Sequence, residues 1–187
     1  PHNLTQKEIN DLVKEAMSNN QSLYTVNGEL LRSLEPDLIL TQGICDVCAV
    51  TPHTIEASLR GVSCQLSANT QILSFEGTSF QGIFEDLRAL GRLTDRETLA
   101  EKLIGQAQKT IESNSTQHST SLLLLEWIDP PFSAGHWVPE QIEAAGFRSA
   151  IGKRGDHSRT LTWNEIKASN PDVIGVICCG FDLESNR

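Results

Sequence analysis

The chain has 187 residues, of which 39% are hydrophobic and 5% aromatic, and it carries a formal net charge of −9 at pH 7. This composition is typical of a globular protein with one domain or two small ones, and it excludes an intrinsically disordered chain. The acidity argues against a nucleic-acid-binding surface, and no apolar run reaches the ~20 residues that span a bilayer. The polar opening at residues 1–3 predicts no signal peptide, and the sequence leaves the cellular compartment undetermined.

Helices are predicted where apolar residues recur every three or four positions after a start signal. They cover residues 5–19, 27–34, 52–60, 78–90, 94–113, 139–145 and 162–169. Three of these helices start with a capping box, in which a hydroxyl and a glutamate three residues later satisfy the first N–H groups. The three pairs are Thr5 with Glu8, Thr94 with Glu97, and Thr162 with Glu165. The helix at 94–113 is the longest and lies between the two halves of the chain.

Strands are predicted at four apolar runs that alternate with the helices. The runs lie at residues 37–41, 70–75, 121–126 and 172–178. Their uninterrupted apolar character suits strands that are buried on both faces of a sheet. Because strands and helices alternate, we expect an α/β fold with mainly parallel sheets.

One pattern occurs twice in the chain. Residues 34–43 and 169–180 each contain Pro-Asp, then an apolar run, then a glycine, directly after a predicted helix. Proline ends each helix because it lacks an N–H and clashes with the preceding turn. The repetition predicts two similar α/β lobes with a ligand-binding cleft. We expect residues 1–93 to form the first lobe, 94–113 a connecting helix, and 114–187 the second lobe.

Aromatic residues gather in the segment 126–140, which follows the predicted strand 121–126. Open α/β sheets bind ligands at the carboxyl ends of their strands, because loops and helix N-termini converge there. We expect a loop stiffened by prolines that carries Trp127, Phe132, His136 and Trp137. Such rings are costly to expose unless they pack on something, and a flat apolar ligand would suit them. The alternative is that the rings fill an interface between the lobes.

Five cysteines, Cys45, Cys48, Cys64, Cys178 and Cys179, cannot all pair within one chain. Reduced, buried thiols are the favoured interpretation. A four-thiolate metal site and a redox Cys-x-x-Cys centre remain as alternatives. The Cys-x-x-Cys stands four residues before Pro52, where the next helix is predicted to start, and this placement is poor for a redox centre.

Motifs of the common enzyme classes are missing from the sequence. The histidines show no H-E-x-x-H spacing, and there is neither a G-x-S-x-G nucleophile turn nor a phosphate-binding glycine loop. We therefore predict that the protein is not an enzyme. We expect surface or structural roles for His157 and Ser158, and we place only His136 near a ligand.

Four blocks of the sequence together resemble a known family. They are P-D-L-I-L-T-Q…C-D-V-C-A-V at 36–50, E-W-I-D-P…G-H-W-V-P-E at 126–140, H-S…T-W at 157–163 and P-D-V-I…C-G-F-D-L at 171–183. They resemble the cobalamin (vitamin B12)-type substrate-binding proteins of ABC importers. These are class III periplasmic binding proteins, a family that also carries iron-siderophores and haem, and the resemblance runs over nearly the whole chain.

The resemblance implies two Rossmann-like lobes joined by one long helix, with the ligand between the lobes. It implies a ligand wall that consists of Gln42, Cys45 and Cys48 in the first lobe and Trp127, Pro130, Phe132, Gly135, His136 and Trp137 in the second. It also implies that Glu140 or Glu143 docks onto arginines of a permease. The implied protein is extracytoplasmic and needs no obligatory cofactor or metal. Its ligand is cobalamin or a related large chelate.

The chain also departs from this family. Family members begin with a strand and continue for several elements after the region of Gly180, so both ends of the family fold are expected to be missing here. Ala145-Gly146 stands where the family usually has two glycines. One alternative is therefore an interaction or structural subunit of a larger assembly that uses the same fold without ligand. Another is a thiol-metal or redox protein that acts through Cys45, Cys48, Cys178 and Cys179.

Overall fold

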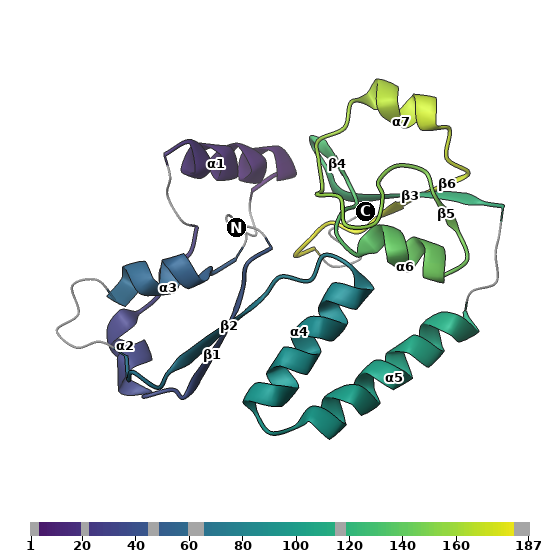
Figure 1. Ribbon diagram of the computed structural model, residues 1–187. Coiled ribbons are helices and arrows are strands. Elements are labelled where there is room, and N and C mark those ends of the chain that lie inside the picture. The colour runs from purple at the N-terminus through teal and green to yellow at the C-terminus, as the bar shows by residue number, and fades with distance from the viewer. Residues whose placement is uncertain (1–3, 20–22, 45–48, 60–65, 115–118, 182–187) are drawn as a thin grey trace. The chain divides into compact units, whose positions relative to one another are not determined.

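The structure is a computed structural model that describes residues 4–19, 23–44, 49–59, 66–114 and 119–181 (Figure 1). It confirms an α/β protein and divides into two compact units. The β3 unit comprises Pro1–Asp11, Thr78–Gln81 and Lys102–Arg187, and the β1 unit comprises Leu12–Gly77 and Gly82–Glu101. The boundaries expected from the sequence, at 1–93, 94–113 and 114–187, stay a prediction. Within the described residues, no helix is long and apolar enough to cross a membrane.

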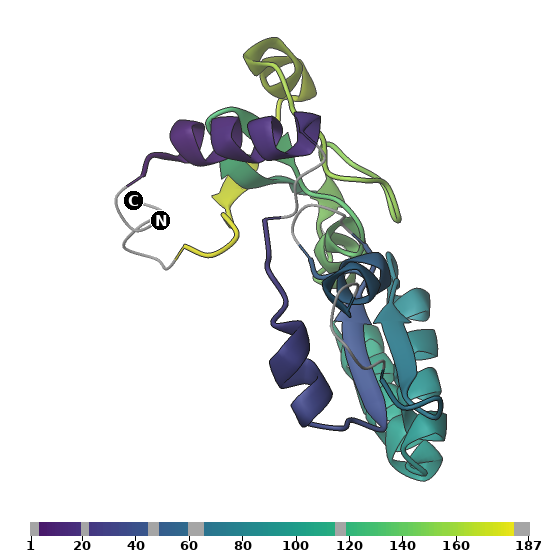
Figure 2. The same cartoon turned by 90° about the vertical axis from the view of Figure 1, so that its left-hand side faces the viewer.

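The β1 unit contains a two-stranded parallel sheet. Its elements are α2 (Gly28–Ser33), β1 (Leu38–Gln42), α3 (Pro52–Leu59) and β2 (Gln71–Phe75). The register runs from Leu38 opposite Gln71 to Gln42 opposite Phe75, and Figure 2 shows the two strands side by side. Helix α2 starts at Asn27, whose side chain accepts a hydrogen bond from the Leu30 N–H at 3.0 Å. All four elements lie within two residues of their predicted bounds.

The β3 unit is built around one strand. Its elements are β3 (Ser121–Ile128), β4 (Pro131–Ser133), α6 (Val138–Ala144), β5 (Arg148–Ser149), α7 (Trp163–Ser169) and β6 (Val173–Val176). Strand β3 is parallel to β5 and β6 and antiparallel to β4. Three further helices contribute residues to both units: α1 (Gln6–Ser18), α4 (Phe80–Leu93) and α5 (Glu97–Ser113). The prediction of mainly parallel sheets is confirmed.

Alternate side chains of β3 form the core of its unit. Leu123 and Leu125 are 0% and 3% exposed, and they pack with Leu161 and Ile166. Successive side chains of a strand point to opposite faces, so these two leucines share one face of the sheet. Ile166 lies in α7, and the core therefore joins that helix to the face of β3.

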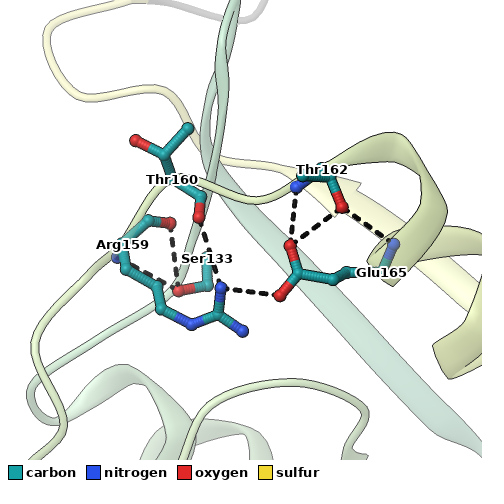
Figure 3. Close-up of polar contacts among 5 residues, drawn as sticks. All are labelled: Ser133, Arg159, Thr160, Thr162 and Glu165. Atoms are coloured by element: carbon teal, nitrogen blue, oxygen red, sulfur yellow. Dashed lines mark hydrogen bonds and ion pairs between the residues drawn. The ribbon is translucent and has the colours of Figure 1, made fainter.

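Helix α7 begins with the predicted capping box (Figure 3). The Thr162 N–H donates to a Glu165 carboxylate oxygen at 2.8 Å, and the Glu165 N–H donates to the Thr162 hydroxyl at 3.2 Å. The other oxygen of Glu165 accepts from the Arg159 guanidinium at 2.8 Å. Because the Ser133 N–H donates to the Arg159 carbonyl at 2.9 Å, the start of α7 is tied to β4.

Of the other two predicted capping boxes, one is confirmed and one is wrong. The Thr5 N–H donates to Glu8 at 2.7 Å, and the Glu8 N–H donates back to the Thr5 hydroxyl at 3.2 Å. The Thr94 hydroxyl instead donates to the Leu90 carbonyl at 2.8 Å and so completes the end of α4. Asp95 follows with a φ of 53°, a left-handed turn that separates the two helices. Helix α5 therefore begins at Glu97, and not at residue 94.

The repeated Pro-Asp step has the same place in both sheets. Asp172 stands just before β6, and its carboxylate accepts from the N–H and the hydroxyl of Ser121, the first residue of β3, at 2.6 and 2.8 Å. These bonds lower the pKa of Asp172. Just before β1, the Pro36 carbonyl accepts from the Thr70 hydroxyl at 2.8 Å, next to the start of β2. Each Pro-Asp step thus binds the beginning of the neighbouring parallel strand.

Replacing Leu123 by alanine should lower the free energy of unfolding by about 2–5 kcal/mol, because the side chain is fully buried and leaves a cavity. The measurement is urea unfolding followed by circular dichroism. Leu99→Ala is the control, since that side chain is 49% exposed in α5, and we expect a change within about 0.5 kcal/mol. Equal effects of the two substitutions would contradict the assignment of the core.

Candidate functional site

The aromatic segment is more regular than the loop expected from the sequence. It consists of the end of β3, a turn at Asp129-Pro130, the strand β4 and the start of α6. Leu125 lies opposite Ser133 and Trp127 lies opposite Phe132, so the register shifts at the residue between Leu125 and Trp127. Such a bulge bends a strand and changes the direction of its side chains. The prediction of a loop stiffened by prolines was wrong for residues 127–133, because antiparallel pairing of β3 with β4 orders them, and residues 134–137 connect β4 to α6.

All six predicted ligand residues of this segment lie in the β3 unit. They are Trp127, Pro130, Phe132, Gly135, His136 and Trp137. Gly135 is buried, and the other five are partly buried. Their assignment as a ligand wall stays a prediction.

Trp127 is held by the first turn of α1. Its indole N–H donates to the carbonyls of Gln6 and Asp129, at 3.2 and 3.1 Å, and its ring meets Phe181 edge to face at 5.4 Å. The Gln6 side chain accepts from the Ile128 N–H at 2.9 Å and donates to the Cys178 sulfur at 3.2 Å. Sequence analysis missed Gln6, because nothing in a polar residue of an amphipathic helix indicates contacts more than 100 residues away.

Two chain segments lie very close to each other at Gly135. A Cβ atom at this position would lie 2.6 Å from the Ser158 hydroxyl oxygen and 2.8 Å from the His157 carbonyl carbon. The next residue, His136, has a φ of 55°, which non-glycine residues rarely adopt. Its N–H donates to the Asp156 carbonyl at 2.6 Å, and its carbonyl accepts from the Gly155 N–H at 3.0 Å. Segment 155–158 therefore fixes this turn from both sides.

The imidazole of His136 is partly removed from water. Its ring lies 5.4 Å from the His157 ring, edge to face, and 6.0 Å from the Trp137 ring. Its Nε2 atom is buried and has no hydrogen-bond partner among the described residues. Burial lowers the pKa of His136; the nearby Glu126 opposes this shift and His157 adds to it. The neutral imidazole is thus the favoured form.

Glu126 connects β3 to the two segments around Gly135. One carboxylate oxygen accepts from the Gly135 N–H at 3.2 Å, and the other accepts from the Ser158 hydroxyl in a short hydrogen bond. Sequence analysis assigned no role to Glu126, and it expected Ser158 on the surface or in a structural role. Their contact joins residues 32 positions apart, and no local pattern signals such a pair.

The two predicted docking residues both have partners inside the β3 unit. Glu140 is 13% exposed; it accepts from the Phe80 N–H at 2.6 Å and lies 3.7 Å from the Arg154 guanidinium. Glu143 is 40% exposed and pairs with Arg154 at 2.5 Å. Docking onto a permease stays a prediction for both residues, and the greater exposure favours Glu143.

Of the three ligand residues predicted in the first lobe, the structure describes Gln42. Gln42 is exposed at the end of β1 and lines an open, mostly apolar groove of about 660 Å³. The groove belongs to the β1 unit, with Tyr24, Ile39 and Phe75 among its lining residues. Cys45 and Cys48, the other two predicted ligand residues of this lobe, lie outside the described residues.

The thiols at the other end of the chain lie side by side in sequence but differ in exposure. Cys178 is buried, Cys179 is exposed, and both are free. Within the described ranges, no three His, Cys, Asp or Glu side chains are grouped so that they could hold a metal ion. A four-thiolate site would also need Cys45 and Cys48, and it stays an untested alternative.

Gly135→Ala should lower the free energy of unfolding by about 1–3 kcal/mol, because the new methyl group overlaps Ser158 and His157. Gly105→Ala is the matched control. Gly105 lies inside α5, where an added methyl group would meet no atom within 4 Å, and alanine there should stabilise the protein by about 0.5–1 kcal/mol. Thermal and urea unfolding check both values. A tolerated Gly135→Ala would contradict the close approach of Ser158.

The lowered pKa of His136 makes stability depend on pH. In the unfolded chain the pKa returns to its usual 6.5, so that chain binds more protons than the folded protein between the two pKa values. The free energy of unfolding should therefore fall as the pH drops from about 6.5 toward the lowered pKa. His136→Asn, which tolerates the left-handed backbone, should show a shallower fall in urea unfolding across this window. The same slope in both proteins would contradict the buried, neutral imidazole.

Three solved structures are similar to this chain in fold. A periplasmic binding protein from Veillonella parvula matches with a TM-score of 0.64 and 20% identity over 84% of the present chain. Two Vibrio cholerae proteins also match. They are the periplasmic vitamin B12 binding protein BtuF, with a TM-score of 0.58 and 18% identity over 81% of this chain, and the periplasmic heme binding protein HutB, with 0.62 and 19% over 80%. The chain spans 55%, 58% and 57% of their respective lengths.

A family model gives the decisive comparison. A comparison with curated protein sequences gave no match. The model described as periplasmic binding protein matches residues 16–186, which is most of the chain and includes both Pro-Asp strands and the aromatic segment. The two α/β units agree with this match. The chain belongs to the periplasmic binding protein family.

Proposed function

We propose that this chain is the substrate-binding component of an ABC importer and that its ligand is cobalamin or a similar large chelate, such as another corrinoid, a siderophore or haem. The observation that carries the proposal is that four residues with aromatic rings follow one another in the segment at and after the end of β3. Trp127 lies opposite Phe132, and the rings of His136 and Trp137 lie 6.0 Å apart. We expect the chain to bind its ligand without transforming it.

The chemistry of these rings supports a flat, largely apolar ligand. Burial of apolar surface contributes about 25 cal/mol per Å², and each aromatic side chain can bury roughly 150–250 Å². The indole N–H of Trp127 is already bonded to carbonyl groups, so this ring offers a ligand mainly apolar surface. His136 adds a partly buried ring whose favoured form is neutral, so this ring places no positive charge beside an apolar ligand surface.

The comparisons support this class of ligand and a location outside the cytoplasm. Among the proteins with this fold, BtuF binds vitamin B12 and HutB binds heme, and both are described as periplasmic. We extend these properties to the present chain as part of the proposal. A permease is then the expected protein partner, and Glu143 is the more accessible of the two acidic docking residues.

Titration with cyanocobalamin and, separately, hemin tests the proposal, with tryptophan fluorescence and calorimetry as readouts. Trp137→Ala should weaken binding about 30-fold, because loss of a central aromatic contact costs about 2 kcal/mol. The matched control is Trp163→Ala in α7, whose side chain is 58% exposed, and it should leave the affinity unchanged. Failure of both ligands to bind the wild-type chain would contradict the proposed function.

A further inference from the structure

We propose that Glu126 and Ser158 are positioning residues, which hold His136 and Trp137 in the arrangement that binds the ligand. The inference rests on the proposed function, and it adds two residues that bind the backbone next to the rings or each other. Glu126 lies at the bulge near the end of β3, and Ser158 lies in the segment between β5 and α7. The two side chains meet directly.

The carboxylate of Glu126 has a different partner for each oxygen. One oxygen accepts from the Gly135 N–H, and the other accepts from the Ser158 hydroxyl. A single rigid group therefore sets the distance between β3, the Gly135 backbone and segment 155–158. Hydrogen bonds to a charged acceptor are short and directional, which suits them to fix a geometry.

The backbone leading to the rings depends on this spacing. There is no room for a side chain at Gly135, where Ser158 would contact an added Cβ. His136 keeps its left-handed φ of 55° while its N–H and carbonyl are bonded to Asp156 and Gly155. A strained conformation of this kind persists only when the surroundings over-determine it. A shift of Ser158 would move its neighbours Gly155 and Asp156, and with them the turn that orients the two rings.

Trp137 receives its direction from the same turn. It directly follows His136 and precedes the first residue of α6, whose start is fixed by the buried Pro139. The Val138 N–H donates to the Gly135 carbonyl at 3.0 Å, so Gly135 is bonded through both its N–H and its carbonyl. The backbone of Trp137 therefore lies between two fixed points, Gly135 and α6.

A hydrogen bond between a partly buried carboxylate and a hydroxyl contributes little net stability to a fold. Removing such groups from water costs free energy that the hydrogen bonds only offset, whereas apolar side chains of the same size would pack without that cost. The pair is better explained by the geometry that it specifies. The inference predicts that breaking the pair disturbs the rings more than it disturbs the fold.

The test compares Ser158→Ala with the matched control Ser149→Ala. The Ser149 hydroxyl is also partly buried and donates to the Ile151 and Gly152 carbonyls, at 3.0 and 3.3 Å, away from Glu126. In the ligand-free proteins, NMR should show shifted signals of the Trp137 indole N–H and the His136 ring in Ser158→Ala only. Affinity for cyanocobalamin or hemin should fall about tenfold in Ser158→Ala, and should stay within about threefold in Ser149→Ala.

Two variants of Glu126 complete the design. Glu126→Gln keeps the length of the side chain and can still accept from Gly135 and donate to Ser158, so it should retain the affinity within about threefold. Glu126→Asp keeps the charge but is one methylene shorter; it should lose about tenfold, and it replaces Ser158→Ala if that variant does not fold.

The outcomes separate this inference from the proposed function. If the Trp137 and His136 signals and the affinity are unchanged in Ser158→Ala and Glu126→Asp, the pair is merely structural and the inference is overturned. If neither ligand binds the wild-type chain, the proposed function fails. The NMR comparison of the ligand-free proteins then still decides whether the pair positions the rings.

Discussion

The pairing of β3 on both of its edges is the constraint on which the β3 unit depends. Along one edge, Leu122 to Leu125 lie opposite Val173 to Val176 of β6, and along the other edge β5 and β4 pair with the two ends of the strand. The same strand supplies the buried leucines of the core. Because the backbone of β3 is bonded on both sides, the residues at its end begin from a fixed position.

The change from core to candidate site takes place within one residue of β3. Leu125 is buried, and the register with β4 shifts directly after it. The shift releases Glu126 from the regular pairing and lets its carboxylate reach Gly135 and Ser158. Rigid strand pairing and a single bulge together give this segment both stability and a new direction. Trp127 and Phe132 therefore stand on a hairpin that is ordered by the core, and His136 and Trp137 follow it in the turn before α6.

Sequence patterns predicted the elements that depend on local residues. The capping box of Thr162 and the Pro-Asp strands carry their signal within about ten residues, and the structure contains them. Strands β4 and β5 have three and two residues, and only pairing with β3 defines them, so no periodicity could reveal them. The same reason applies to the site. Local composition indicated a cluster of rings, but the contact of Glu126 with Ser158 forms only after the chain has folded back on itself.

The bond between Ser121 and Asp172 has a consequence for the order of folding. It joins positions 51 residues apart at the start of two neighbouring strands, so β3 leaves the ribosome well before β6 is available. Until then, one edge of an apolar strand has its N–H and carbonyl groups unpaired, which is the state most prone to join a strand of another molecule. Contacts of such long range also slow folding, because the loop between them must close first. We therefore expect the arrival of β6 to be the slow step in the folding of this unit, during which one edge of β3 stays exposed.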